Sequence, residues 1–328
     1  MKLFLYILCA VEGKLISDKI QVVTRVPKNP SIKTTPFYGK SIGGLNMLNS
    51  KLQMTKEVGV ASDERVKVQP WPEDSAKYYF PVAGLTYCSD QELLQYNGTY
   101  SKEIGPDFQI TNILNHATLD TRAILAVNPP RKEIVLAFRG TQSKLNWVSN
   151  LIISQTLISV APFASVHTGF KDIADAMAPE YIQALHQLLA TPTYSEYDVV
   201  VTGHSLGGAL AQLASIHAHR KLKLGWERIK IVTFGQPRVG NLDFARWFNQ
   251  QPVMYTRVVN ENDLVPHVPP IFTNYIHTHL ERYIKNNSSR VCSTAWMEDP
   301  TCSGSRLLTL DADAHGNAWD MKISKAKC

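Results

Sequence analysis

The feature that most constrains the fold is a glycine-flanked serine at positions 203–207, which read Gly-His-Ser-Leu-Gly. It follows a β-branched run, Val199–Val201, that is typical of a buried strand. It precedes a small, apolar stretch, Ala209–His219, that is typical of a buried helix. A strand, a G-x-S-x-G turn and a helix in this order predict a nucleophile elbow with Ser205 on a strained turn. The alternative is a chance match in an ordinary glycine turn.

Hydrophobic patterning on both sides of this turn predicts alternating strands and helices. Short apolar or β-branched runs predict strands at Phe108–Leu114, Thr121–Val127, Glu133–Phe138, up to Thr202, at Ile229–Phe234 and at Val253–Val259. An alternating segment, Tyr275–Ile284, predicts one more strand. Helical spacing predicts a helix over Asp172–Leu189 and another near Phe244. This alternation is typical of an α/β protein with a mostly parallel central sheet.

Charge is distributed unevenly along the 328 residues, whose formal net charge is +6. Residues 1–70 contain 11 Lys/Arg and 5 Asp/Glu, whereas residues 71–328 contain 23 of each. The neutral remainder gives no electrostatic reason to expect a nucleic-acid partner. We interpret the polar, basic residues 14–72 as a pro-segment ahead of a domain over residues 73–328. The alternative is an N-terminal arm that stays attached.

Residues 1–13 have the pattern of a secretory signal peptide. Lys2 precedes a short apolar run, Leu3–Val11, and cleavage after Ala10 or after Gly13 would fit. The run is too short to span a bilayer, and no later run approaches the required length. We therefore expect a secreted, extracellular protein without an integral membrane span. A buried first strand or helix is the alternative.

The cysteines agree with secretion. Four remain after Cys9 is lost with the signal, an even number that suits two disulfides and allows three pairings. Cys292 and Cys302 lie ten residues apart, which favours a local loop and leaves Cys88 with Cys328. No C-x-x-C or paired-histidine spacing predicts a metal site. Sequons make the following residues candidates for N-glycosylation: Asn97, Asn286 and Asn287.

A nucleophilic serine needs a base and an acid that orients the base, and in this fold the acid precedes the histidine in the chain. Asp263 lies on the loop after the strand Val253–Val259, at the edge of the sheet where active sites form. Glu261 is the competing acid. Turn capping is an alternative role for Asp263.

Three histidines satisfy the chain order for the base: His277, His279 and His315. His267 is too close in the chain to Asp263. His315 lies on a polar loop near the chain end, whereas His277 and His279 lie in a predicted strand, so we favour His315. An oxyanion hole would use the backbone N–H of Leu206 and a donor at Thr141, after the strand Glu133–Phe138.

Four motifs, in order, resemble the fungal secreted triacylglycerol lipases of the Rhizomucor and Thermomyces type. They are Phe138–Thr141, Val166–Phe170, Gly203–Ala209 and Thr233–Asn241. The resemblance covers roughly residues 75–328. It implies an α/β-hydrolase fold with a helical lid and a pro-segment.

The same resemblance assigns roles to individual residues. It implies a triad of Ser205, Asp263 and His315, with oxyanion roles for Thr141 and Leu206. It also supports a disulfide between Cys88 and Cys328, because family members tie the first helix to the C-terminus. Asn150 and Ala164 depart from some relatives, which carry Asp and Cys there, so that lid-linked contact and that disulfide are not expected.

The segment between Thr141 and Val166 decides the substrate class. Helical spacing of Leu145, Val148, Leu151 and Ile152, with Trp147 beside them, predicts an amphipathic lid. Such a lid could open at an oil–water interface. A surface helix that stays on the core is the alternative.

We therefore expect a monomeric secreted lipase without a cofactor, acting on long-chain acylglycerols. The alternatives are a phospholipase A1, a feruloyl-type carboxylesterase, or a catalytically silent lipid-binding protein.

Overall fold

The structure, a computed structural model, describes residues 68–141, 153–306, 311 and 313–328. The chain divides into two units, Met1–Ser50 and Lys51–Cys328, and every described residue belongs to the second. None of the described helices is long and apolar enough to cross a membrane. The predicted signal peptide and most of the predicted pro-segment lie outside the described residues. So do the predicted lid residues, which are Leu145, Trp147, Val148, Leu151 and Ile152.

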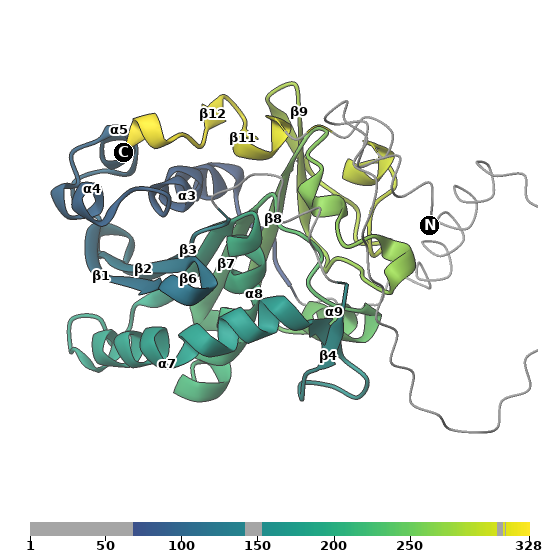
Figure 1. Cartoon of the computed structure of the whole chain (residues 1–328), viewed down its shortest axis with the longest axis horizontal. Coiled ribbons are helices and arrows are strands. Elements are labelled where there is room, and N and C mark those ends of the chain that lie inside the picture. Colours follow the sequence, from purple (N-terminus) through teal and green to yellow (C-terminus); the bar gives the residue numbers. More distant parts are fainter. Residues whose placement is uncertain (1–67, 142–152, 307–310, 312) are drawn as a thin grey trace, which may run out of the picture. The chain divides into compact units, whose positions relative to one another are not determined.

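An eight-stranded sheet forms the centre of the described domain (Figure 1). Its spatial order is β1 (Gln109–His116), β2 (Thr121–Asn128), β3 (Glu133–Phe138), β6 (Asp198–His204), β7 (Ile229–Phe234), β8 (Met254–Asn260), β9 (Glu281–Lys285) and β10 (Ser288–Val291). The pairings from β3 through β9 are parallel, and those at the two edges are antiparallel. The predicted α/β architecture with a mostly parallel sheet is confirmed. Two small antiparallel pairs are β4 (Gln155–Leu157) with β5 (Ser165–His167) and β11 (Asn317–Ala318) with β12 (Met321–Lys322).

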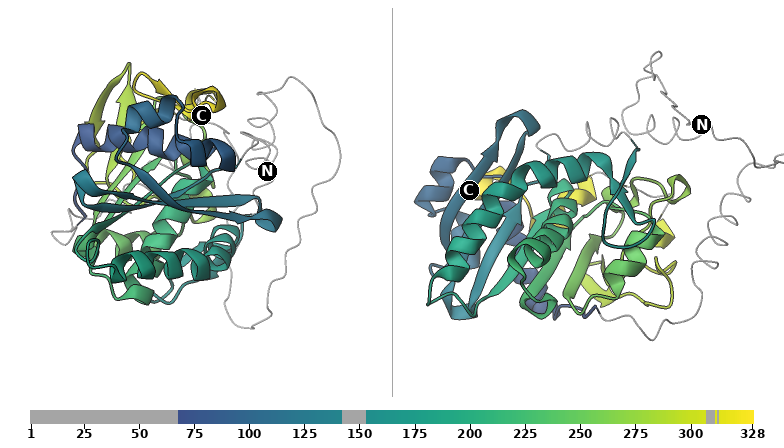
Figure 2. Two further views of the ribbon diagram at one scale, coloured as in Figure 1. Left: turned by 90° about the vertical axis from the view of Figure 1, so that its left-hand side faces the viewer. Right: turned by 90° about the horizontal axis from the view of Figure 1, so that it is seen from below.

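Helices cover both faces of this sheet (Figure 1, Figure 2). One layer contains α7 (Thr168–Ala190), α8 (Leu206–Leu222) and α9 (Leu242–Asn249). The other contains α3 (Glu73–Leu85), α4 (Asp90–Gln95) and α5 (Thr99–Ile104). Short 3₁₀ turns are η1 (Ala117–Leu119), η2 (Pro129–Arg131), η3 (Trp226–Arg228), η4 (Val265–His267), η5 (Ile271–Thr273), η6 (Ser303–Arg306), η7 (Asp313–Gly316) and η8 (Lys325–Lys327).

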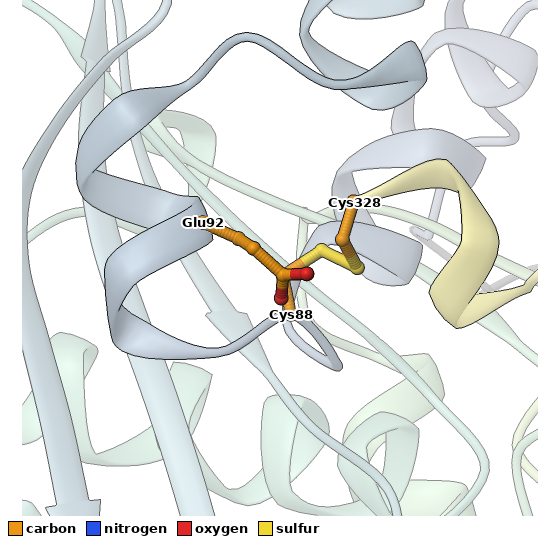
Figure 3. A group of neighbouring side chains, drawn as sticks. All are labelled: Cys88, Glu92 and Cys328. Carbon is orange, nitrogen blue, oxygen red and sulfur yellow. A yellow bond between two sulfur atoms is a disulfide. The ribbon is translucent and has the colours of Figure 1, made fainter.

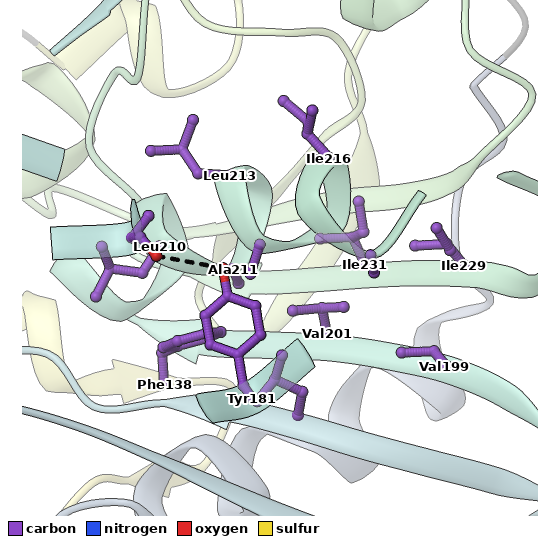
Figure 4. Packing of buried hydrophobic residues seen from close by; sticks show 14 of the residues in the cluster. Phe138, Tyr181, Val199, Val201, Leu210, Ala211, Leu213, Ile216, Ile229 and Ile231 are labelled. Carbon is purple, nitrogen blue, oxygen red and sulfur yellow. Dashed lines mark hydrogen bonds between the residues drawn. The ribbon is translucent and has the colours of Figure 1, made fainter. Parts of the chain in front are cut away.

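The two faces of the sheet bury alternate residues of the same strands. Val199 and Val201 of β6 pack toward α7 and α8, as Figure 4 shows, whereas Val200 packs toward α3. On the α7 side the rings of Phe138 and Tyr181 meet edge to face at 5.6 Å. Fully burying side chains of this size stabilises the fold by about 1.5–3 kcal/mol each. The strand that ends at the serine turn is therefore held from both sides.

Residues 68–72 belong to the domain, although the sequence pattern assigns them to the pro-segment. The backbone of Gln69 exchanges hydrogen bonds of 2.9 Å with Val253 and Tyr255 beside β8. Trp71 is only 3% exposed, and its indole N–H donates to the carbonyl of Ile231 at 2.8 Å. These contacts favour a boundary before Val68.

Two disulfides, Cys88–Cys328 and Cys292–Cys302, are present. Cys88 follows α3 and Cys328 is the last residue, so this bond joins the beginning of the domain to its end (Figure 3). It links residues 240 positions apart. Closing so long a loop restricts the unfolded chain and typically stabilises a fold by about 2–4 kcal/mol.

The predicted strand Tyr275–Ile284 is wrong over its first half, because β9 begins only at Glu281. The backbone N–H of His277 donates to Glu298 and that of His279 donates to Asn249, so neither is available to a strand ladder. Leu280 then adopts a left-handed conformation with φ 66°, which interrupts extended backbone. Side-chain partners distant in the chain thus override a local alternating pattern.

Candidate active site

Ser205 occupies a strained turn between β6 and α8. Its φ of 62° and ψ of −131° lie where residues with a side chain are rare. The glycines on both sides are required by space: a Cβ on Gly203 would lie 2.3 Å from the carbonyl oxygen of Gly207, and one on Gly207 would lie 2.2 Å from that of Phe138. The Ser205 N–H donates to Phe234 on the neighbouring strand at 2.9 Å. The backbone has the form of a nucleophile elbow.

His315 and Asp263 meet at the same edge of the sheet. The Nδ1 of His315 lies 2.9 Å and 3.0 Å from the two carboxylate oxygens of Asp263, and both side chains are buried. Asp263 also accepts from the N–H of Val265 at 2.9 Å, which fixes its orientation. Among the described residues no group bonds the buried Nε2 of His315. That nitrogen is therefore free to exchange a proton, as a general base requires.

The competing residues have other partners. Glu261 accepts from the backbone N–H of Asn286 at 2.7 Å. His277 Nε2 bonds the carbonyl of Pro266 at 2.7 Å, and His279 Nε2 lies 3.2 Å from the sulfur of Met297. His315, and not His277 or His279, is therefore the histidine that is hydrogen-bonded to Asp263.

The two predicted oxyanion donors flank the serine turn. Leu206 is the first residue of α8, where free backbone N–H groups and the helix dipole favour negative charge. Thr141 follows Gly140 at the end of β3. A Cβ on Gly140 would lie 2.8 Å from the Cβ of Ser205, so this loop passes directly beside the turn. The arrangement brings both predicted donor segments to Ser205.

Three further residues belong to this site but were not assigned from the sequence: Gly235, Tyr87 and His204. Gly235 has φ 58°, and a Cβ there would lie 2.7 Å from an Asp263 oxygen and 2.8 Å from the His315 ring. The sequence signal that could have identified Gly235 is its place directly after the predicted strand Ile229–Phe234. His204 is the variable position of G-x-S-x-G. Tyr87 gives no local signal, because its partner His204 is 117 residues away.

Two groups of described side chains have the spacing of metal ligands: Cys88 with Glu92 and Cys328, and Glu281 with Cys292 and Cys302. Each contains a disulfide pair, whose sulfurs are not the thiolates that bind metals (Figure 3). In the second group, Glu281 also accepts hydrogen bonds from Ser303. We assign no metal or cofactor to either group.

The free energy of unfolding is expected to fall as the pH is lowered from about 6.5 toward 4. Burial lowers the pKa of His279 to about 4 and holds that of His277 well below its usual value. In this window the unfolded chain binds more protons than the folded one, so stability rises with pH. His279 alone would account for about 2 kcal/mol lost at pH 5.

Urea unfolding at about pH 7 and about pH 5 measures this effect. A His279→Gln variant should lose less stability between the two than the wild type. Equal stability of the wild type at both values would contradict the assignment of neutral, buried histidines.

A serine elbow on a mostly parallel sheet, followed along the chain by Asp263 and His315, defines the α/β-hydrolase fold. Residues 135–273 match the family model of lipase (class 3). A curated lipase from Rhizopus niveus is 34% identical over 203 residues, which are 61% of this chain. Over the matched residues, the chain is therefore similar to the class 3 lipases. It spans about half the length of that curated relative, 51%.

Solved structures agree over a larger region. One is a triacylglycerol lipase whose catalytic centre is formed by a serine protease triad; it has a TM-score of 0.71 at 28% identity, covering 77% of this chain and 96% of that one. Another is the Rhizomucor miehei lipase propeptide complex, with a TM-score of 0.70 at 28% identity, covering 76% and 81%. The α/β-hydrolase fold implied by the sequence is confirmed.

Proposed function

We propose that this protein is a secreted triacylglycerol lipase that hydrolyses long-chain acylglycerol esters by a Ser-His-Asp acyl-enzyme mechanism. The observation that carries the proposal is the His315–Asp263 pair beside the Ser205 elbow, in a chain whose residues 135–273 match the class 3 lipase model. A strained serine with a buried acid–base pair is what acyl transfer needs. A catalytically silent lipid-binding protein would not need a serine elbow with a buried acid–base pair.

In this mechanism Ser205 attacks the ester carbonyl while His315 Nε2 takes its proton. Asp263 holds the imidazole through Nδ1 and stabilises the imidazolium that forms. The backbone N–H groups of Leu206 and Thr141 receive the developing oxyanion. His315 then protonates the leaving glyceride alkoxide. Water repeats the cycle on the acyl-enzyme and releases the fatty acid.

Support for a lipid substrate comes from the family and from exposed apolar side chains. Phe272, on the loop after Asp263, is 62% exposed, and Ile153 is 40% exposed. The two segments are linked, because the Gln155 side-chain amide donates to the carbonyl of Asn274 at 2.8 Å. Exposed apolar side chains favour contact with an apolar surface. The predicted lid lies outside the described residues and stays a prediction.

Hydrolysis of three substrates tests the proposal: emulsified triolein, phosphatidylcholine vesicles and a soluble feruloyl ester. We expect the highest specific rate on triolein. A higher rate on phosphatidylcholine would instead favour a phospholipase A1, and a higher rate on the feruloyl ester a carboxylesterase. A Ser205→Ala protein is the blank for each assay. No Ser205-dependent hydrolysis of any of the three would reject the proposed function.

We also propose that the enzyme is secreted as a monomer and loses its basic N-terminal segment on maturation. The two disulfides suit an oxidising compartment, and a related lipase is known as a propeptide complex. The candidate glycosylation residues are all exposed: Asn97, Asn286 and Asn287. N-terminal sequencing of the secreted protein should find a start much closer to Val68 than to residue 14; a start near residue 14 would contradict maturation.

A further inference from the structure

We infer that Tyr87 and His204 form a positioning pair that holds the catalytic base through its backbone. His204 Nε2 bonds the carbonyl oxygen of His315 at 2.7 Å, and His204 Nδ1 bonds the hydroxyl of Tyr87 at 2.8 Å. The His204 and His315 rings lie 4.4 Å apart. This inference rests on the proposed function, since it concerns the base of that reaction.

The proton positions follow from the partners. A carbonyl oxygen can only accept, so His204 Nε2 carries a proton and donates it to His315. Burial raises the pKa of Tyr87 well above its usual value, so its hydroxyl stays protonated. That hydroxyl can donate to Nδ1, which is the acceptor of a neutral imidazole. Two hydrogen bonds therefore connect Tyr87 through His204 to the backbone of His315, and the bond from Tyr87 holds the His204 ring in the orientation that its bond to His315 needs.

The pair also contacts the other parts of the site. His204 is the residue before the nucleophile. A Cβ on Gly140 would lie 2.4 Å from the Tyr87 hydroxyl oxygen, so Tyr87 touches the loop that leads to Thr141. Cys88, the next residue after Tyr87, is tied to Cys328. This pair, of which His204 is buried and Tyr87 is half-buried, therefore spans the segments of the nucleophile, the base and an oxyanion donor.

Other hydrogen bonds also hold the segment around His315: the N–H of Asp311 donates to the carbonyl of Asn262 at 2.7 Å. Near the histidine, the amide of Asn260 donates to the carbonyl of Ala314 at 3.2 Å, and the N–H of Ile323 donates to that of Gly316 at 2.8 Å. The bond from His204 reaches the carbonyl of His315 itself. A catalytic group must be held within about 0.5 Å of its working position. A shift of about 1 Å can cost about a hundredfold in rate.

The test is the kinetics of His204→Phe on a soluble short-chain ester. Phenylalanine keeps the ring and removes both hydrogen bonds. We expect kcat to fall about 10- to 100-fold and KM to change less than about twofold, because substrate binding is not touched. His204→Gln places an amide donor near the old Nε2 and should recover kcat to within about fivefold of wild type.

Tyr87→Phe should lower kcat less than His204→Phe, because the bond to His315 remains. The double variant should be no worse than His204→Phe alone, as expected for residues in one chain of bonds. His219→Phe is the matched control: its ring stacks on Trp226 and its Nδ1 bonds the carbonyl of Leu224 at 2.8 Å, away from the site. It should keep wild-type kcat.

An unchanged kcat in a folded His204→Phe protein would overturn the inference, and so would a change confined to KM. Thermal unfolding of each variant establishes that it is folded. If His204→Phe does not fold, Tyr87→Phe decides, and a wild-type kcat in it overturns the inference. Failure of the proposed function looks different: the wild-type protein would then show no ester hydrolysis that depends on Ser205.

Discussion

Replacing Ser205 with alanine is expected to lower kcat for ester hydrolysis by at least about a thousandfold and to leave the fold intact. The hydroxyl is the proposed nucleophile, and no other group stands on the elbow between β6 and α8 to replace it. Alanine is smaller and faces the same backbone strain, so stability should change little. Steady-state kinetics with emulsified and soluble esters measures the loss, and thermal unfolding tests the fold.

Ser215→Ala is the matched control, because Ser215 is a buried serine of α8, the helix that follows Ser205, and its hydroxyl donates to the carbonyl of Gln212 at 2.6 Å. It should remain active. A Ser205→Ala protein that retains more than about a thousandth of the wild-type kcat would reject Ser205 as nucleophile.

His315→Ala is expected to match Ser205→Ala in severity, because members of a triad act as one unit. Without the imidazole, nothing removes the serine proton, and the Asp263 carboxylate loses the group that it orients. The same kinetic assays, over a range of pH, measure the effect. A residual rate far above that of Ser205→Ala would contradict the role of His315.

His277→Gln and His279→Gln are the comparison variants. Their imidazoles bond Pro266 and contact Met297, not Asp263. Each should keep kcat within about fivefold of wild type, although stability can change because both are buried. If His277→Gln or His279→Gln were inactive while His315→Ala remained active, the histidine replaced in the inactive variant would be the general base instead.

The parts of the fold that the sequence predicts well are those with a local cause. Ile229–Phe234 and Glu133–Phe138 are runs rich in apolar and β-branched residues, and β7 and β3 have those bounds. The elbow combines a β-branched strand, two glycines and a small-residue helix within one short segment. Steric contacts inside that segment require the glycines, so neighbouring residues suffice to predict it.

The parts that escaped prediction depend on partners distant in the chain. The sequence already favoured His315 among three histidines, and its contact with Asp263 supports that choice. Tyr87 had no signal, because its role comes from His204. Trp71 lies in a segment that resembles a pro-segment by composition, but its indole hydrogen bond to β7 places it in the core. Local pattern cannot reveal contacts of this kind.

The central claim is that Ser205 is the nucleophile of an esterase that His315 and Asp263 activate. Its most direct measurement is mass spectrometry of the protein after incubation with a long-chain alkyl p-nitrophenyl phosphonate, which traps the serine of such enzymes as a covalent adduct. The account predicts one adduct per chain, on the peptide that carries Ser205, formed in step with loss of activity and absent from Ser205→Ala. An inactivated enzyme whose Ser205 peptide is unmodified, with the phosphonate on another residue, would contradict it.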